Sequence, residues 1–286
     1  MDPAAVLVAV LYHPAKAGAA ETSERIAAGI AQIGAGAAQI LSLHDLDPAT
    51  LRGCALAIVV GGDGSILGAA RLCAPLDIPL LPIQLGRLGL LAEIEAHDVD
   101  VVLPYYLRGD CWRDGRLMLS AALDDGQGED ILALNDVVVA RGVSSGPIRI
   151  DVTLGGHRYG TVWGDGLIVA TPTGSSAYTR SAGGPIIHPA VASLSLTAIA
   201  PQSGPPPLLV VPADESVSLR VTTDASSWVL LADGLVHAQP LSGMTVTVAR
   251  APHDAVFLRR GDRYRLQRRL RDLLVGDPRP RAGASE

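Results

Sequence analysis

An aspartate surrounded by glycines follows the apolar segment 55–60, at the point where a strand is expected to end. Glycines let the backbone approach a ligand closely and adopt φ > 0, and amides at the start of a following helix can face phosphate oxygens. A carboxylate among such amides repels phosphate unless it holds a metal ion or accepts a proton from a hydroxyl group. We therefore interpret the segment as a phosphoryl-transfer loop in which Asp63 is the base or the hydroxyl anchor. Its members are Gly61, Gly62, Asp63, Gly64 and Ser65.

This glycine loop also has a simpler interpretation. Asp and Gly are common turn residues, so segment 61–65 alone fits an ordinary turn equally well. The sequence holds no G-x-x-x-x-G-K-[ST] segment, which excludes a P-loop mechanism.

A second candidate segment, residues 164–185, is rich in hydroxyl side chains (GDGLIVATPTGSSAYTRSAGGP). A predicted strand at 167–170 leads into it, and six serines and threonines lie between Thr171 and Ser181. Hydroxyls and free amides near a helix start suit a ribose or a phosphate. The alternative is a Ser/Thr-rich loop with an N-cap, which explains one such residue but not their density beside a second Asp-Gly pair.

A third candidate is the polar pair Asn135 and Asp136 inside the apolar segment 133–142 (ALNDVVVARG). A polar pair in a buried strand costs free energy unless something satisfies it, and a base edge or a ribose would do so. The alternative is that one of the two side chains points to solvent from an edge strand or a bulge. Taken alone, the pair fits this second interpretation better.

Two halves of the sequence show different periodicities. Up to about residue 110, apolar strands at 5–12, 55–60 and 79–85 alternate with helical segments, and this βαβ rhythm predicts a parallel sheet covered by helices. From residue 112, short β-rich segments separated by turn residues predict a sandwich-like domain. The segment 263–276 has the apolar spacing of an amphipathic helix, which we expect to pack back on the first domain.

We therefore expect an α/β protein in three stretches. Residues 1–112 form an N-terminal α/β domain with the glycine loop, residues 113–254 form a β-rich domain, and residues 255–286 return to the first domain.

Composition restricts the possible partners and compartments. The formal net charge is −6 and the one dense basic run, residues 259–271, fits the solvated face of a helix, so we expect no nucleic-acid partner. Three isolated cysteines argue against a disulfide framework and favour the cytoplasm. Seven scattered histidines make a metal site held by the protein improbable. The apolar run at the N-terminus is far shorter than the ~18 residues of a membrane helix, so we expect no membrane association.

These segments, in this order, resemble motifs of the NAD kinase family. GGDGS is similar to the family's Gly-Gly-Asp-Gly-Thr loop, LGLLAEI to its Leu-Gly-Phe-Leu segment, and LND to its Asn-Glu motif. The block DGLIVATPTGSSAYTRSAGGPIIHP matches the family almost position for position, and IAPQSGPPPLLVVP and LLADG resemble its later segments. The glycine loop is shared with phosphofructokinases and lipid kinases, so the block from Thr171 to Pro185 is the most specific part of the resemblance.

The resemblance implies a Rossmann-like (phosphofructokinase-like) N-terminal domain and a β-rich, NAD-binding second domain. It implies phosphorylation of the adenosine 2′-hydroxyl of NAD by ATP or polyphosphate, with Mg²⁺ or another divalent cation carried on the donor, in a homodimer or homotetramer. Asp63 falls on the catalytic aspartate. The predicted substrate- and nucleotide-binding residues are Gly61, Gly62, Gly64, Ser65, Leu90, Asn135, Asp136, Trp163, Asp165, Thr173, Ser176, Ala177, Tyr178, Ser181 and Asp233.

The sequence departs from the family pattern at five positions around this site. The family's Glu is Asp136, its Phe is Leu90, and its Asn in the Gly-x-Asn segment is Gln84. Trp163 lies in the region where the family has an Arg, and Leu235 lies where the family has Gln. We expect Trp163 to stack on the base in place of the ring that Leu90 lacks.

Two further functions stay open at this stage. The first is a related kinase with a sugar or lipid acceptor, against which the 171–185 block and the β-rich half argue. The second is a nucleotide-binding sensor without efficient catalysis, which the departures favour and the intact Asp63 loop opposes.

Overall fold

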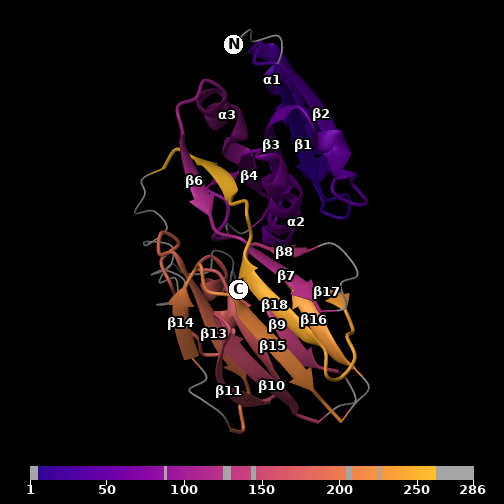
Figure 1. Cartoon of the computed structure of the whole chain (residues 1–286). Helices are drawn as coiled ribbons and strands as arrows, with labels where there is room; N and C mark the ends of the chain where they lie inside the picture. Colours follow the sequence, from indigo (N-terminus) through magenta and orange to yellow (C-terminus); the bar gives the residue numbers. More distant parts are fainter. Residues whose placement is uncertain are drawn as a thin grey trace, which may run out of the picture.

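The first half of the chain builds a parallel sheet (Figure 1). The computed structural model describes residues 6–86, 89–124, 130–142, 146–203, 208–224 and 227–261. The four N-terminal strands lie in the order β2-β1-β3-β4 and pair in parallel, as expected for apolar strands joined by helical crossovers. The elements are β1 (Leu7–Tyr12), α1 (Ala19–Gln32), β2 (Ala37–Ser42), β3 (Cys54–Gly61), α2 (Asp63–Cys73) and β4 (Leu80–Gln84), with two short 3₁₀ helices, η2 (Pro48–Leu51) and η3 (Ala74–Leu76).

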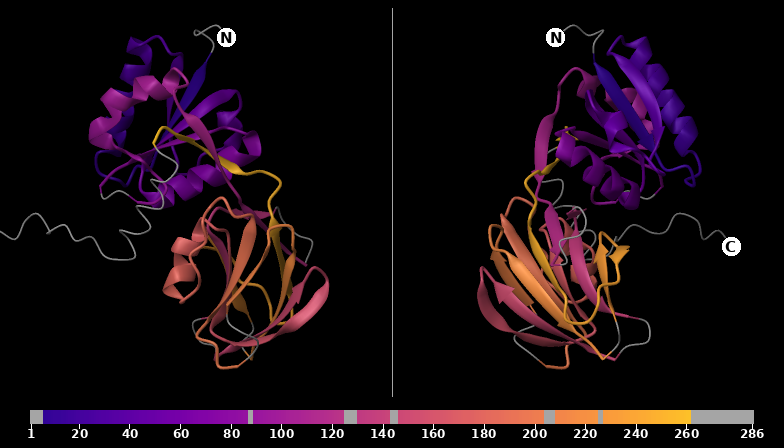
Figure 2. Two further views of the ribbon diagram at one scale, coloured as in Figure 1. Left: turned by 90° about the vertical axis from the view of Figure 1, so that its left-hand side faces the viewer. Right: turned by 45° about the vertical axis from the view of Figure 1, so that its right-hand side comes forward.

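The end of the chain completes this first sheet. Strand β19 (Ala255–Arg259) inserts beside β4 in parallel, and β6 (Trp112–Arg116) pairs with β19 in the opposite direction. Figure 2 shows the yellow β19 segment entering the sheet of the upper domain after the chain has built the lower one. The remaining elements of this domain are β5 (Ile94–Glu95), which pairs with β4, the 3₁₀ helix η4 (Ala96–Asp98) and α3 (Val99–Leu107).

The middle of the chain forms two antiparallel sheets packed face to face (Figure 1). One sheet has the order β11-β10-β15-β18-β7-β8, and the other has the order β14-β13-β12-β9-β16-β17. The strands of the first are β7 (Leu119–Leu123), β8 (Ile131–Ala133), β10 (Ile148–Leu154), β11 (His157–Gly164), β15 (Val217–Thr222) and β18 (Thr245–Arg250). The strands of the second are β9 (Asp136–Arg141), β12 (Gly166–Ala170), β13 (Ser193–Ile199), β14 (Leu208–Pro212), β16 (Trp228–Ala232) and β17 (Leu235–Ala238), and β12 is followed by η5 (Gly174–Ser176) and α4 (Tyr178–Ser181).

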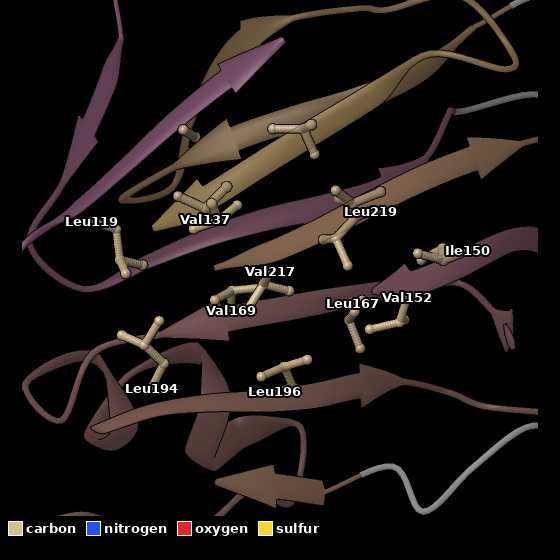
Figure 3. Packing of buried hydrophobic residues seen from close by; sticks show 14 of the residues in the cluster. Leu119, Val137, Ile150, Val152, Leu167, Val169, Leu194, Leu196, Val217 and Leu219 are labelled. Carbon is tan, nitrogen blue, oxygen red and sulfur yellow. The ribbon is translucent and has the colours of Figure 1, made fainter. Parts of the chain in front are cut away.

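Each layer interface has its own apolar core. Figure 3 shows the sandwich core, where alternate side chains of both sheets meet, among them Leu119, Val169 and Leu219. The parallel sheet is covered on one face by α2 and on the other by α1 and α3. The core around α2 includes Met118 and Leu134, which lie at the start of the sandwich, so the two domains share apolar packing at their junction.

The predicted fold class is confirmed, with one shift in a boundary. The strands expected at 5–12, 55–60 and 79–85 are β1, β3 and β4, and a Gly155-Gly156 turn joins β10 to β11 with φ of 51° and 83°. Residues 113–116, assigned above to the second domain, belong to β6 of the first sheet, because their partner is β19. The return to the first domain is seen at 255–259, whereas the helix expected at 263–276 lies outside the described residues.

None of the helices in the described ranges combines the length and the apolar character that a bilayer span requires.

Candidate active site

The glycine loop forms the N-terminus of helix α2. Gly62 is the N-cap residue with extended backbone, φ −105° and ψ −175°, and Asp63 is the first helical residue. The backbone N–H groups of Ser65 and Ile66 donate to the Gly62 carbonyl at 2.9 and 3.2 Å, which closes the first turn. Asp63 and Gly64 are exposed. The loop therefore presents a carboxylate at the positive end of the helix dipole, where anions are stabilised.

One glycine of this loop, Gly61, is required by packing rather than by backbone angle. The expected positive φ is wrong here, because Gly61, Gly62 and Gly64 are not among the residues with positive φ. A Cβ at Gly61 would overlap the Oγ of Ser65, which is buried against the strand end. Gly64 faces open space, so a ligand can approach its backbone there.

Asp63 packs against a second glycine, Gly89, from the loop that follows β4. A Cβ at Gly89 would overlap both carboxylate oxygens of Asp63. The Asp63 carboxylate therefore lies over a bare Cα, and the side chain is held between the start of α2 and the 89–92 segment.

The predicted Asn135–Asp136 pair lies where the chain crosses from one sheet of the sandwich to the other. Strand β8 ends at Ala133 in the first sheet, and Asp136 begins β9 in the centre of the second. Asn135 is partly exposed, whereas Asp136 is 4% exposed. The pair is thus neither in a bulge nor in an edge strand, and only Asn135 presents a substantial surface to a ligand.

The carboxylate of Asp233 holds this crossing in place. Its Oδ1 accepts the N–H of Asn135 at 2.7 Å and its Oδ2 accepts the N–H of Leu134 at 3.1 Å. The N–H of Asp233 donates to the Asp136 carbonyl at 2.9 Å. Asp233 and Gly234 have φ of 50° and 78° and form the turn between β16 and β17, a conformation that Asp-Gly adopts readily. Asp233 is among the residues predicted to bind nucleotide. Its side chain is fully buried and accepts hydrogen bonds from backbone N–H groups of the crossing.

Burial raises the pKa of Asp136 to about 7, and the charge of Asp233 adds to this effect. A carboxyl group in an apolar strand favours the neutral form because ionisation there lacks solvation.

The hydroxyl-rich block packs directly on the same crossing. Thr171 donates from Oγ1 to the Leu134 carbonyl at 2.6 Å, and its N–H donates to the Asn135 carbonyl at 2.9 Å. A Cβ at Gly174 would overlap the Asn135 backbone, so glycine is needed for this close approach. The hydroxyl of Ser175 is buried and binds the carbonyls of Pro172 and Ile187. Part of the hydroxyl density thus shapes the loop instead of contacting a ligand.

Other members of the block stay accessible. Tyr178 is 46% exposed at the start of α4, and Ser181 is exposed one turn later. Ser176 is half-buried and donates from Oγ to the Thr173 carbonyl at 3.1 Å. Ala177 joins η5 to α4 with φ −97° and ψ −118°, which turns the chain sharply beside Tyr178.

Two arginines that sequence reasoning missed connect the first domain to the second, Arg71 at the Asp233 turn and Arg116 at the hydroxyl block. Arg71, in the last turn of α2, donates from Nη1 to Asp233 Oδ2 at 2.8 Å. Arg116, at the end of β6, approaches Thr173 Oγ1 at 3.4 Å. Arg116 also pairs with Asp114 at 2.6 Å, and Asp114 in turn accepts from Arg259 at 3.3 Å. Arg71 lies only eight residues after Asp63, but neither Arg71 nor Arg116 belongs to a predicted motif, so only an expected domain junction could have indicated them.

Family models match both halves of the chain. The ATP-NAD kinase N-terminal domain matches residues 42–111, and the ATP-NAD kinase C-terminal domain matches residues 134–260. An NAD kinase of Heliobacterium modesticaldum is 40% identical over 215 residues, which cover 74% of this chain and 76% of that protein. An NAD kinase of Dehalococcoides mccartyi is 33% identical over 257 residues, covering 88% of this chain and 90% of its own. The chain belongs to the NAD kinase family.

Solved structures of NAD kinases share the fold. The structure of yeast NADH kinase complexed with NADH has a TM-score of 0.82 at 21% identity and covers 99% of this chain and 91% of its own. That of an NAD kinase from Archaeoglobus fulgidus in complex with ATP has a TM-score of 0.76 at 23% identity and covers 94% of this chain and 99% of its own. Family and relatives together identify a phosphotransferase with NAD kinase activity.

Two predicted NAD kinase site residues lie away from the cluster around Asn135. Trp163 and Asp165 precede β12, whereas Thr171 follows it, and a six-residue separation in an extended strand spans about 20 Å. Trp163 is 40% exposed. Asp165 pairs with Arg141 of the neighbouring strand β9 at 3.0 Å. The family's arginine before the Asp165-Gly166 pair is absent here, and Arg141 brings an arginine to that pair from β9 instead.

Leu90 and Gln84 lie near the glycine loop. Leu90 is half-buried, one residue after Gly89. Gln84 ends β4 in register with Gly61, and a Cβ on Gly62 would lie 3.8 Å from its Nε2. Its buried Oε1 has no hydrogen-bond partner among the described residues. Leu235, the fifth departure, is 53% exposed at the start of the edge strand β17.

Within the described ranges, no group of three or more His, Cys, Asp or Glu side chains is arranged to hold a metal ion.

Proposed function

We propose that the chain transfers a phosphoryl group from ATP or polyphosphate to the adenosine 2′-hydroxyl of NAD, giving NADP, and that Asp63 is its catalytic base. The observation that carries this assignment is the placement of Asp63, an exposed carboxylate at the N-terminus of α2 that rests on the bare Cα of Gly89. A carboxylate fixed beside helix-terminal amides suits proton removal next to a transferring phosphoryl group.

In this mechanism Asp63 accepts the 2′-hydroxyl proton as the ribose oxygen bonds to the terminal phosphorus of the donor. The bond from that phosphorus to its bridging oxygen breaks, and ADP, or the shortened polyphosphate, leaves with the bonding pair. The backbone at Gly62–Gly64 faces the transferring group with the positive end of α2, which stabilises the charge on its oxygens. A divalent cation such as Mg²⁺ enters as part of the donor substrate and neutralises its phosphates.

The acceptor nucleotide binds to the accessible face of the crossing and of the hydroxyl block. Asn135 offers an amide to the base or the ribose, and Ser176 and Ser181 offer hydroxyls nearby in the block. Tyr178 offers an exposed ring for stacking. Asp136 and Asp233 support this surface from beneath, because their side chains are buried.

We further propose a homodimer or homotetramer in the cytoplasm. Exposed apolar side chains on both edge strands of the second sandwich sheet support self-association: Leu208, Val210, Leu235 and Val236. Light scattering on the purified chain measures its mass directly, and a monomer at micromolar concentration would refute this part.

The decisive experiment is an NADP-formation assay with NAD, Mg²⁺ and either ATP or polyphosphate. Wild type is compared with Asp63→Asn, which keeps the size of the side chain and removes its basicity. We expect turnover by wild type and a fall in kcat of about 10²-fold or more in the variant, the loss typical of a positioned base. NAD binding, measured by calorimetry, should change little. Binding of NAD by wild type without turnover would instead indicate a nucleotide sensor.

A further inference from the structure

The side chain of Arg71, in the last turn of α2, forms an ion pair with Asp233 of the second domain. Arg71 lies eight residues after Asp63, which places it about 12 Å further along the same helix. Its Nη1 is 2.8 Å from Asp233 Oδ2, and the two side chains are 18% and 0% exposed. The first and last turns of one rigid helix therefore carry the proposed base and a cross-domain ion pair.

The partner of Arg71 is itself bound to the segment that carries Asn135. Asp233 accepts backbone N–H groups of Leu134 and Asn135 at 3.1 and 2.7 Å, and that of Asp136 more weakly at 3.4 Å. Asp233 thus connects α2 to the one partly exposed residue of the β8–β9 crossing.

This ion pair is not needed to satisfy Asp233. The carboxylate keeps its backbone donors from residues 134–136 if Arg71 is lost, so its oxygens stay hydrogen-bonded although its charge loses the neighbouring guanidinium. Removing one partner of a buried ion pair lowers stability, so the folded fraction of every Arg71 variant is measured beside its kinetics. What disappears with Arg71 is the link between the Asn135 segment and the helix of Asp63.

We propose that Arg71 is a positioning residue for the phosphoryl transfer, which holds the Asn135 segment at a fixed distance and angle from Asp63 through the carboxylate of Asp233. The inference rests on the proposed function, in which the acceptor nucleotide touches Asn135 while its 2′-hydroxyl meets Asp63. A nucleotide that contacts both residues reacts only when Asn135 and Asp63 are correctly placed relative to each other. A misplacement of about 1 Å can cost about 10²-fold in rate.

The test compares Arg71→Met, Arg71→Lys, Asp233→Asn and the double variant Arg71→Met/Asp233→Asn in the NADP-formation assay. Met keeps the length of the stem without its charge, and Asn suits the left-handed turn position of residue 233. We expect Arg71→Met to raise KM for NAD and to lower kcat, each by about 5- to 10-fold, and Arg71→Lys to recover part of both. The double variant should be no worse than the more impaired single variant, because both substitutions break one link.

Two controls separate positioning from simple loss of folded protein. Arg250→Met breaks the exposed Arg250–Asp254 pair, at 3.1 Å, and should leave both kinetic constants unchanged. Thermal unfolding of each variant, with kinetics measured well below its midpoint, excludes partial unfolding as the cause. If Arg71→Met has wild-type KM and kcat, or if its kcat falls only in proportion to the folded fraction, the inference is wrong while the proposed function stands. If wild type forms no NADP, the proposed function fails and the inference fails with it.

Discussion

The carboxylate of Asp63 lies directly against the Cα of Gly89, with no space for a side chain between them. Asp63 belongs to the first turn of α2 and Gly89 to the loop after β4, so two adjacent strands of the parallel sheet supply the two surfaces. The contact makes residue 89 part of the environment of the proposed base, although a glycine has no reactive group of its own.

Replacing Gly89 by alanine is expected to lower kcat by about 10-fold or more with little loss of stability. The added methyl group must displace the Asp63 carboxylate, and a misplaced catalytic group loses rate steeply. The atoms that the methyl group meets are the free end of the Asp63 side chain and not backbone, so a rotation of that side chain can accommodate it and the fold is little affected. Steady-state kinetics and thermal unfolding of the same preparation check both parts.

Gly29→Ala is the matched control, because a Cβ there would meet only Leu103 Cδ2 at 3.9 Å, an ordinary contact. Its kcat should equal that of wild type. Equal kcat values for the two alanine variants would contradict the role of Gly89.

Asp136 makes folding less favourable as the pH rises. Its pKa is raised from 3.8 to about 7 in the folded protein, so the folded state binds the proton more tightly than the unfolded state. The stability is unaffected by this group below pH 4, falls between pH 4 and pH 7, and stays lower above that range. Asp136→Asn should remove this component, on the order of 1 kcal/mol per pH unit. Urea unfolding at pH 5 and pH 8 tests it, and an identical pH dependence in variant and wild type would refute it.

Asp114 is expected to stabilise the domain junction by neutralising two buried arginines. It accepts from Arg116 and Arg259, each 5% exposed, and the second guanidinium has its pKa lowered by burial and by Arg116. Asp114→Asn leaves both cations without this counter-charge, which should cost about 3 kcal/mol of unfolding free energy. Asp254→Asn, at the exposed Arg250 pair, should cost less than about 1 kcal/mol. Comparable losses for the two variants in urea titrations would disprove the prediction.

The structure places Trp163 about 20 Å along β12 from the Asn135 surface, so its stacking on the base requires a nucleotide that extends to both ends of that strand. Base–aromatic stacking contributes about 1–3 kcal/mol, so Trp163→Ala should raise the Kd for NAD by about 5-fold or more. Tyr159→Ala is the control, because Tyr159 is another exposed aromatic of β11, with 37% exposure against 40% for Trp163. Calorimetry gives both constants, and an unchanged Kd for Trp163→Ala would eliminate the stacking hypothesis.

The local parts of the site could be predicted from the sequence. The glycine loop at a strand end and the hydroxyl block after β12 both depend on short-range chemistry that neighbouring residues reveal. The order of βαβ units likewise indicated the parallel sheet, because apolar periodicity changes with the type of element.

The long-range parts could not be predicted. Arg71 and Asp233 are 162 residues apart, and nothing in either neighbourhood indicates the other. The sequence also could not show that Asp136 and Asp233 point inward while Asn135 stays accessible, because adjacent polar residues in a strand face opposite sides and the register decides which. The sequence around residue 89 likewise does not indicate that a glycine is required there, because the requirement comes from the side chain of Asp63 at the start of α2.

The position of β19 between β4 and β6 constrains the order in which the chain can fold during synthesis. Strand β6 joins the parallel sheet only through β19, so it has no partner in that sheet until residues 255–259 leave the ribosome. At about 5–20 residues per second, synthesis of residues 117–254 takes on the order of ten seconds. The sandwich is therefore completed first, and it brings the Arg116 and Ala255 ends together in register. The first domain to be translated is thus the last to be finished, and a nascent chain stalled before residue 255 leaves the Leu80 end of β4 without its β19 partner.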